Sequence, residues 1–553
     1  AGTRAAGEPP YATPFAADAL AALAAAHRDR ERRRPGPPGR FAPVYLLDLE
    51  TLRVSRAPLV RDAECQECGT AVADTAEGAR IELRPAPKEE PSSMRRRGAD
   101  AYDLPLEPFA NPVCGMLGTS VVPDLTSAST SSVVGCFTLR SGSYLRETFW
   151  GGHTGRYARS VRVGVLEGLE RHAGMRARGR TTAVTAAYRD LGDDALDPRS
   201  CGLYSEDFHR RQPQVRPFSP DRPIRWVWGW SLRDRRPLLV PEVLAYYHAP
   251  GGPAERFVQE SSNGCASGGC LEEAVLFGLL EAVERDAFLI SWYGRVPLPE
   301  IDPATSRRPA TRHLVDRLAM YGYRARFFDT RITFPVPVVT AVAQRTDGGP
   351  GALCFGAGAS PDPEAALAAA LAEIATDAVN LPRRTLRDLA RLRAMAADFD
   401  QVRALHDHPL LYGLPEMAGY ADFLLAPRAA DPSEQDLIGS GPSGSGPRRR
   451  AVADLAGPHP PAADVRDDLE RALEAVTARG FDVVVVDQTT PEQRESGLHT
   501  AAVLVPGLIP IDFGRWRQRA LHMPRLRTAL REAGRLDGDL RPDELNPAPH
   551  PFP

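Results

Sequence analysis

The sequence predicts an α/β (α+β) protein in which two copies of a helix–strand unit surround one central site, with a small domain ahead of them. Three observations support this class. Long apolar patterns of helical period alternate with short runs rich in Val and Phe, two pairs of segments repeat at a fixed spacing, and the composition changes near residue 85. With 553 residues, 43% of them hydrophobic, the chain can bury a large core.

The first predicted unit is a small N-terminal domain with a linker, residues 1–105. Within it, residues 43–61, PVYLLDLETLRVSRAPLVR, alternate like two paired strands. Residues 85–100 have the composition of a linker. The larger unit, residues 106–553, is interrupted by a Gly- and Ser-rich loop near 432–450 that we expect to be mobile.

Two internal echoes predict the duplicated architecture. LEGLER at 166–171 matches LEAVER at 280–285, and YGYRARFFDT at 321–330 matches RGFDVVVVDQ at 479–488. In the second pair a helical pattern ends at Gly, a strand follows, and Asp closes it before another strand begins. We therefore expect two copies of one α/β unit.

Composition and charge argue against several functions. The net charge of −3 and the pI near 6.5 indicate no nucleic-acid or membrane surface. No apolar run reaches the ~20 residues of a membrane span, no signal peptide is evident, and the cysteines are scattered, so we expect a cytoplasmic protein without a disulfide framework. The single lysine, Lys88, lies in a polar stretch, which argues against a P-loop, a protein kinase and a Schiff-base enzyme.

Three glutamates lie inside the most apolar helical pattern of the chain. At about 100° per residue, Glu273, Glu281 and Glu284 fall along one face, although the surrounding positions are apolar nearly all round. A buried carboxylate needs a cation partner, a metal or a raised pKa. Arg285 can neutralise one of the three acids and leaves the others to be explained.

The echo segment adds Glu167 and Glu170, which are neighbours on their own helix. Carboxylates with few His or Cys nearby suit Mg²⁺ better than Zn²⁺, and protein-bound Mg²⁺ usually shares its shell with substrate phosphates. These residues predict a metal–nucleotide site without a P-loop. The alternative is that Glu167 and Glu281 are helix-surface acids, each paired locally with Arg171 or Arg285.

The stretch SSNGCASGGCLEEAVLFGLLEAVERDAFLISWY, residues 261–293, resembles the YcaO family, and the resemblance covers roughly residues 110–553. VPGLIPIDFG at 505–514 and LNPAPHPFP at 545–553 resemble the azoline-forming branch of that family. The resemblance implies the YcaO fold, which binds ATP and activates peptide-backbone amides.

The activity implied by this resemblance is that of an ATP-dependent cyclodehydratase acting on ribosomal precursor peptides, as for thiazole/oxazole-modified microcins and thiopeptides. A Cys, Ser or Thr side chain attacks the preceding amide carbon, ATP phosphorylates the amide oxygen, and phosphate leaves to give a thiazoline or oxazoline. Bound Mg²⁺ would offset charge on the transferred phosphoryl group. A thioamide-forming YcaO enzyme and a non-catalytic scaffold subunit are the alternatives.

The family's motif also implies which residues carry the chemistry. The acids on Mg²⁺ and ATP would be Glu167, Glu170, Glu273, Glu281, Glu284 and Glu373, with Arg285 on phosphate. Three positions depart from the pattern: Val163 where Ser is frequent, Gly269 where Asn is frequent, and Thr376 where Gln is frequent. These departures bear on the finer nucleotide contacts and keep the scaffold alternative open.

The proline-rich end carries an expectation of its own. Pro549, Pro551 and Pro553 fill the P-x-P-x-P pattern of the azoline-forming branch, and alternating prolines favour a stiff polyproline II segment. We expect this tail to be ordered and to bring the carboxylate of Pro553 to the site, as a base or an orienting group.

Partners and zinc are the last expectations. The N-terminal domain is too short for a complete E1-like domain, so the resemblance implies a separate E1-like (ocin-ThiF type) protein that binds the leader peptide, and a homodimer. The sequence does not decide whether an FMN-dependent dehydrogenase later aromatises the rings. Cys65 and Cys68 have the spacing of a zinc knuckle, which Cys114 and Cys136 would have to complete; Zn²⁺ and free thiols are both possible there.

Overall fold

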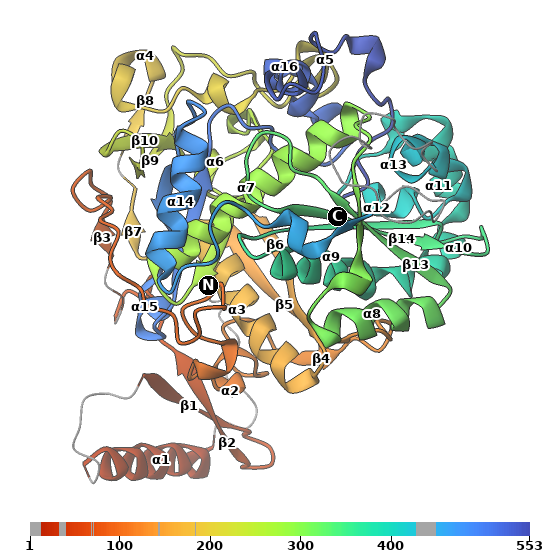
Figure 1. Ribbon diagram of the computed structural model, residues 1–553. Coiled ribbons are helices and arrows are strands. Elements are labelled where there is room, and N and C mark those ends of the chain that lie inside the picture. The colour runs from red at the N-terminus through yellow and green to blue at the C-terminus, as the bar shows by residue number, and fades with distance from the viewer. Residues whose placement is uncertain are drawn as a thin grey trace.

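The computed structural model describes residues 13–32, 40–67, 69, 71–141, 144–182, 184–426 and 449–552. Helices and strands alternate along the chain, and sheets of six, five and three strands are covered by helices (Figure 1), as the predicted α/β (α+β) class requires. The loop expected near 432–450 lies, but for its last two residues, outside the described residues.

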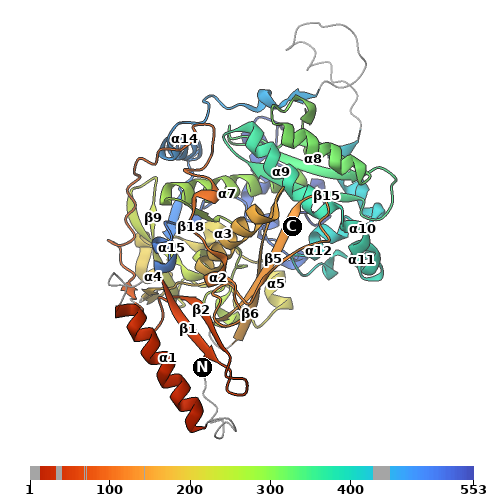
Figure 2. The same cartoon turned by 90° about the horizontal axis from the view of Figure 1, so that it is seen from below.

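A helix and a hairpin form the first part of the described chain. α1 (Pro14–Arg32) precedes β1 (Phe41–Leu47), which pairs antiparallel with β2 (Val54–Val60), as the alternation over 43–61 predicts. Figure 2 shows these elements at the edge of the molecule, below the main body. β2 packs against α2 (Leu106–Phe109), which joins the hairpin to the rest of the fold.

Residues 85–100 pack against the large unit and are not a free linker. Lys88 Nζ lies 2.5 Å from Asp468 Oδ2, and both side chains are buried. Arg95 Nη1 donates to Glu273 Oε1 at 2.8 Å. The linker-like composition was misleading because the cations in this segment have buried carboxylates as partners, which are distant in sequence.

The six-stranded sheet has the order β10-β9-β17-β18-β11, with β8 beside β9, and its strands pair antiparallel. Its strands are β8 (Val184–Ala186), β9 (Ile224–Ser231), β10 (Arg236–Pro241), β11 (Cys265–Gly268), β17 (Val484–Asp487) and β18 (His499–Leu504). The five-stranded sheet has the order β15-β14-β13-β12-β16, and its β12–β16 pair is parallel. Its strands are β12 (Glu300–Asp302), β13 (Tyr323–Asp329), β14 (Val338–Arg345), β15 (Leu353–Ala359) and β16 (Arg450–Ala451).

The second sequence echo is a repeated structural unit, as predicted. α8 (Pro309–Met320) ends near Gly322, whose φ is 82°, and β13 and β14 follow as an antiparallel pair. α14 (Val465–Thr477) ends near Gly480, with φ 88°, and β17 and β18 follow in the same way. Left-handed glycines end both helices because other residues adopt this conformation at a cost. One copy lies in each large sheet.

A third sheet carries the helix of the first echo. β4 (Val121–Pro123), β5 (Ser131–Ser141) and β6 (Tyr144–Thr154) are antiparallel, and α3 (Tyr157–Met175) packs on β6 and β5. The short strands β3 (Val72–Ala73) and β7 (Arg180–Thr181) pair in parallel.

The long helix α7 (Leu271–Tyr293) runs through the core and is buried nearly all round, as its apolar sequence predicts. It packs on β11, β18 and β15, while α9 (Pro363–Ala378) covers β14 and β15. The other helices are α4 (Tyr188–Leu191), α5 (Glu206–Arg211), α6 (Glu242–Ala245), α10 (Leu381–Arg387), α11 (Leu389–Ala397), α12 (Asp407–Leu411), α13 (Asp422–Leu425), α15 (Pro491–Glu495) and α16 (Pro524–Glu532).

In the described ranges, no single helix is both long enough and apolar enough to cross a membrane. The bent pair of α9 and α10 reaches the required length and apolarity only when the two helices are taken together.

Candidate site at the glutamate cluster

Five of the predicted acids come together from three helices. α3 supplies Glu167 and Glu170, α7 supplies Glu281 and Glu284, and α9 supplies Glu373. Figure 2 shows these helices grouped in the middle of the molecule. The side chains of Glu167 and Glu281 are 32% and 28% exposed, so the cluster opens to solvent on one side.

The acids influence one another electrostatically. Burial, followed by the charges of Glu167 and Glu281, raises the pKa of Glu170 to about 8. Burial, with Glu373 and Glu281 as the neighbouring acids, raises the pKa of Glu284 to about 8. The pKa of Glu373 rises to about 7, again chiefly through burial. These five acids therefore share one region.

Backbone amides of neighbouring strands and loops fix the carboxylates. Gly151 N donates to Glu167 Oε2 at 2.9 Å, and Ser267 N donates to Glu170 Oε2 at 2.9 Å. Gly264 N donates to Glu281 Oε2 at 3.3 Å, and Ala357 N donates to Glu373 Oε2 at 2.9 Å. Each acid thus keeps oxygen lone pairs free beyond the amide contact.

Glycines let the helices approach the strands closely enough for these contacts. A Cβ at Gly152 on β6 would overlap the carbonyl oxygen of Ser160 on α3. A Cβ at Gly278 on α7 would lie 2.5 Å from the carbonyl oxygen of Gly264. The sequence signals were the GG pair after Trp150 and the glycine inside an otherwise bulky helix.

Two arginines face the cluster. Arg171 binds Glu167 Oε1 through Nη2 at 2.6 Å. Arg285 is held more loosely, at 3.4 Å from Glu281 and 3.5 Å from Glu284. Within the described residues, the buried Nη1 of Arg285 donates no hydrogen bond. A buried guanidinium with an unused donor can bind an anion such as phosphate.

Glu273 does not join this cluster. It accepts hydrogen bonds from Arg95 Nη1 at 2.8 Å and from the backbone amide of Arg96 at 3.0 Å. It shares a helix face with Glu284, yet eleven residues of helix separate the two by about 16 Å along the axis. Arg95 balances the charge of Glu273, and a role for Glu273 at the nucleotide stays a prediction.

The proline-rich tail is ordered and buried up to Phe552. Trp292 Nε1 donates to Ala548 O at 3.1 Å, and Tyr412 Oη donates to Pro549 O at 2.5 Å. Phe552 lies under Arg285, with the guanidinium carbon 3.9 Å from the ring centroid. The tail therefore ends its described course at the cluster, whereas Pro553 lies outside the described residues.

The tail is also tied down by a histidine pair that the sequence argument did not use. His408 and His550 stack with ring centroids 4.2 Å apart, and His408 Nδ1 lies 2.8 Å from His550 O. His550 Nε2 lies 2.8 Å from Asp512 O. No spacing rule links His408 to the tail, so the pair could not be found from the sequence.

The glutamates suit an open magnesium shell. Within the described residues, no group of three or more His, Cys, Asp and Glu side chains has the geometry of a preformed metal cage. Mg²⁺ is held in proteins by one or two carboxylates, with water and phosphate oxygens completing its shell. Clustered acids whose pKa values are raised, facing an arginine with an unused donor, fit such a cation and a phosphate.

The three departures from the family pattern have local settings. A Cβ at Gly269 would overlap the hydroxyl of Tyr102, which is buried, so an Asn has no room there. Thr376 Oγ1 donates to Ala372 O at 2.8 Å within α9. Val163 lies half-buried on α3.

The cysteines of the expected zinc site are only partly described. Cys68 lies outside the described residues. Cys114 Sγ contacts Pro58 O at 3.6 Å, and Cys136 Sγ contacts Glu147 Oε1 at 3.2 Å.

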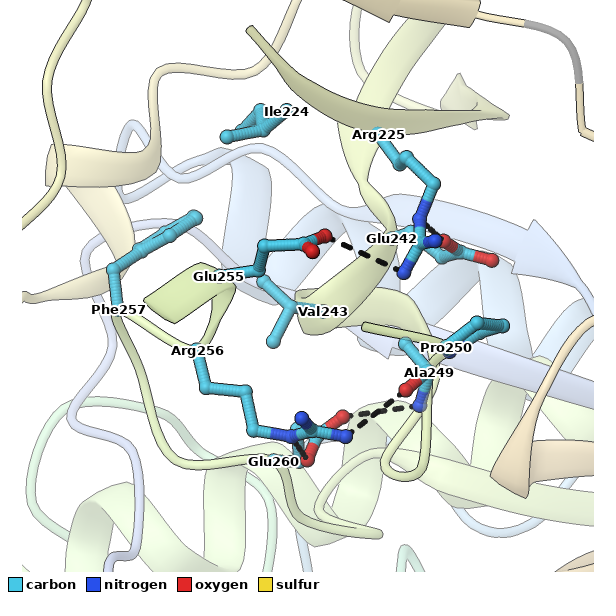
Figure 3. Close-up of a pocket in the computed structure, with 10 residues that line it drawn as sticks. All are labelled: Ile224, Arg225, Glu242, Val243, Ala249, Pro250, Glu255, Arg256, Phe257 and Glu260. Carbon is cyan, nitrogen blue, oxygen red and sulfur yellow. Dashed lines mark hydrogen bonds and ion pairs between the residues drawn. The ribbon is translucent and has the colours of Figure 1, made fainter. Parts of the chain in front are cut away.

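A separate hollow near β9 and α6 is closed by ion pairs (Figure 3). Arg225 Nε lies 2.7 Å from Glu242, and Arg256 Nε lies 2.5 Å from Glu260. The cavity volume of 20 Å³ leaves space for about one water molecule. This hollow is a structural ion-pair network and has no room for a nucleotide.

Comparison with known proteins identifies the family and the fold. Residues 151–509 match the family described as YcaO cyclodehydratase, ATP- and Mg²⁺-binding. An uncharacterised protein of Methanothermobacter thermautotrophicus is 27% identical over 351 residues, which are 62% of this chain and 77% of that protein. An uncharacterised protein from the tfuA 3′ region of Rhizobium leguminosarum bv. trifolii is 32% identical over 163 residues, 28% of this chain and 39% of its own length.

Two solved structures share the fold over almost the whole chain. A heterocyclase in complex with substrate and cofactor has a TM-score of 0.71 at 23% identity and covers 97% of this chain and 68% of its own. The heterocyclase TruD has a TM-score of 0.63 at 23% identity and covers 97% of this chain. This chain spans 65% of the length of TruD.

Proposed function

Since the chain belongs to the YcaO family, whose model spans residues 151–509, we propose that it is an ATP-dependent, azoline-forming cyclodehydratase. Its substrate would be a ribosomal precursor peptide, in which Cys residues, and Ser or Thr, become thiazolines and oxazolines. The observation that carries this proposal is the cluster of five glutamates with Arg171 and Arg285, and the proline-rich tail that ends on Arg285.

We infer that Glu167, Glu170, Glu281 and Glu284 hold Mg²⁺, with Glu373 at the edge of the site. When bound, the cation offsets charge on the phosphates of ATP. The backbone amides that fix Glu167, Glu170 and Glu281 leave further carboxylate lone pairs free to bind a cation. The raised pKa values of Glu170 and Glu284 also fit, because burial and mutual repulsion disfavour their charged forms until a cation is present.

Arg285 is the residue that we assign to a phosphate oxygen of ATP. Its ion pairs with Glu281 and Glu284 are long, at 3.4 and 3.5 Å, and its Nη1 has an unused donor within the described residues. The ring of Phe552 covers one face of the guanidinium and holds its plane. A donor fixed in this way stabilises charge without reorganising during the reaction.

The reaction balances as a dehydration driven by ATP. The peptide thiol or hydroxyl adds to the preceding amide carbon, and the amide oxygen accepts the γ-phosphoryl group of ATP. The oxygen then leaves as phosphate, so the products are the azoline, ADP and phosphate, and the peptide loses one water per ring. Pro553 follows Phe552 directly, and we propose that it lies at the reacting amide, as a base or orienting group.

The partner proposals follow from the family resemblance. We propose that a separate E1-like (ocin-ThiF type) protein presents the leader peptide, that the chain forms a homodimer, and that an FMN-dependent dehydrogenase acts on the rings afterwards.

The test is to incubate the chain with precursor peptide, E1-like partner, ATP and Mg²⁺, and to follow peptide mass and ADP together. Loss of one water per ring with matching ADP release supports the proposal. Glu284→Gln should lower both rates by about 100-fold or more, because the metal loses a ligand. Glu474→Gln, an exposed acid on α14, is the matched control.

Other results would support the alternatives. A gain in mass by exchange of oxygen for sulfur, seen only with added sulfide, would indicate a thioamide-forming enzyme. Complex formation without turnover, and without an effect of Glu284→Gln, would indicate a scaffold subunit.

A further inference from the structure

A groove of 470 Å³ lies between α5, the turn after α11, and the residues after Gly514. Four arginines line it, Arg211, Arg403, Arg515 and Arg517, together with Trp516. Two aspartates, Asp398 and Asp400, are the acids of its lining. The groove is therefore basic, although the whole chain has a net charge of −3.

Three of these arginines are unpaired. In the part of the chain that the structure describes, Arg403, Arg515 and Arg517 form no ion pair, and Arg403 and Arg517 are exposed. Arg211 is the exception, since it lies between Asp207 at 3.3 Å and Asp400 at 3.8 Å.

The acids of the groove are already engaged. Asp398 accepts a hydrogen bond from the backbone amide of Asp400 at 3.1 Å and another from Gln401 Nε2 at 3.3 Å. The carboxylate of Asp400 faces Arg211. Among the described residues, Arg403, Arg515 and Arg517 thus form no ion pair with either aspartate of the groove, and an external anion could bind them.

The backbone holds the groove in shape. Arg515 N donates to Val402 O at 2.8 Å, which joins the two walls. Gly514 has a φ of 96°, and a Cβ there would lie 2.8 Å from Arg403 O, so only glycine fits. Arg211 stacks on Trp516, with the guanidinium carbon 3.4 Å from the ring centroid.

The floor of the groove contacts the tail. Gly514 N donates to His408 Nε2 at 2.8 Å, and His408 stacks on His550 of the tail. From His550 the tail continues to Phe552, which lies under Arg285. A ligand in the groove is thus separated from the tail by one layer of side chains.

We propose that this groove binds an acidic segment of the peptide substrate, through carboxylates paired with Arg403, Arg515 and Arg517. The inference rests on the proposed function for the nature of the ligand. The volume suits a few residues, and peptide carboxylates can be spaced to avoid Asp398 and Asp400. A nucleic acid fits less well, because evenly spaced phosphates would meet both aspartates, and the groove has one tryptophan already covered by Arg211.

The experiment measures binding by the full chain without ATP, so it is independent of the cyclisation assay. A fluorescein-labelled peptide of Glu-Gly-Ser repeats is titrated and followed by anisotropy, with the Gln-Gly-Ser peptide and a labelled single-stranded oligonucleotide in parallel. The Glu peptide should bind at least about tenfold more tightly than the Gln peptide. Its affinity should fall as NaCl rises from about 0.05 to 0.5 M.

Charge reversal locates the site. Arg515→Glu/Arg517→Glu should reduce binding of the Glu peptide to the level of the Gln peptide. The control pair Arg324→Glu/Arg479→Glu, at exposed positions elsewhere, should keep most of the binding. Circular dichroism melts check folding, and Arg403→Gln, at an exposed loop position, replaces the double variant if that variant melts early.

Three outcomes overturn the proposal: equal binding of the Glu and Gln peptides, equal losses in the groove and control pairs, or tighter binding of the oligonucleotide than of the peptide. A chain that cyclises its substrate yet shows one of these results would lose the groove and keep the proposed function. A chain that binds the peptide in this groove but forms no ring would keep the groove proposal and lose the proposed function.

Discussion

Glu284 lies on α7 beside Arg285, and burial with nearby Glu373 and Glu281 raises its pKa from 4.5 to about 8. An acid of this kind stabilises the fold at pH values below its unfolded pKa, and this contribution is lost as pH rises through the folded pKa. The metal-free protein should therefore lose stability between about pH 4.5 and 8.

Glu284→Gln removes this loss, so the metal-free variant should be more stable than wild type at pH 8, by on the order of 1–3 kcal/mol. Urea unfolding at pH 5 and at pH 8 measures the difference. Glu474→Gln, on the exposed face of α14, should change neither value. Equal pH slopes for wild type and Glu284→Gln would show that the acid is satisfied by Arg285 alone.

A second residue-scale prediction concerns Gly269 and Tyr102. Gly269→Ala should destabilise the protein by about 1–3 kcal/mol, because the new Cβ overlaps the hydroxyl of buried Tyr102. Removing that hydroxyl in Tyr102→Phe/Gly269→Ala should recover part of the loss. Thermal melts of both single variants and the double variant give the coupling; additive losses would mean that the two side chains do not meet.

Residue types predicted part of the site. Repeated acids at helical spacing on two apolar helices indicated Glu167, Glu170, Glu281 and Glu284. Helical spacing also grouped Glu273 with these acids; in the structure it is paired with Arg95, and a role for it at the nucleotide stays a prediction. The backbone amides of four residues donate to these glutamates: Gly151, Ser267, Gly264 and Ala357. The sequence could not predict them, because almost every residue has a backbone N–H and only the fold determines which of them reach the carboxylates.

At the scale of elements, the buried ion pair Lys88–Asp468 joins the segment 85–100 to α14, beside hydrogen bonds of Ala86 with Asp464 and Val465. Lys88→Met leaves Asp468 with Arg471, 3.9 Å away, as its remaining cation, and the expected cost is about 3 kcal/mol in the free energy of unfolding. Lys88→Met/Asp468→Asn should recover part of this cost, because the buried carboxylate that has lost its closest cation is gone. Denaturant unfolding measures both; a cost below about 1 kcal/mol for Lys88→Met would mean that the pair is hydrated and weak.

The tail is the second element that can be tested. Phe552→Ala removes the ring under Arg285 and also its packing on Phe288, whose ring centroid is 4.8 Å away. We expect kcat for ring formation to fall by about tenfold or more, because the guanidinium is no longer held. Phe552→Leu restores apolar packing without the aromatic face and separates the two effects. Unchanged kcat in both variants would remove the tail from the active site.

Elements were predictable where they are local. The alternation over 43–61 and the helix–Gly–strand order of the second echo both came from residues adjacent in sequence, and both are in the structure. Residues 85–100 were misassigned because their ordering depends on Asp468 and Glu273, which lie far along the chain.

At the scale of the whole molecule, the site forms because three separate layers meet. α3 lies on the three-stranded sheet, α9 on the five-stranded sheet, and α7 contacts both large sheets. No sequence spacing relates Glu170 to Glu373, since only the packing of these layers brings them together. The duplicated architecture could be predicted from the echoes, but the third sheet and the order of the strands could not.

The most direct test of the central claim is the anomalous diffraction of crystals grown with Mn²⁺ and a non-hydrolysable ATP analogue. Mn²⁺ replaces Mg²⁺ at carboxylate sites and scatters strongly enough to be located. The account predicts anomalous peaks among Glu167, Glu170, Glu281 and Glu284, with a phosphate of the analogue against Arg285. Peaks at other residues only, with these acids still paired to Arg171 and Arg285, would contradict it.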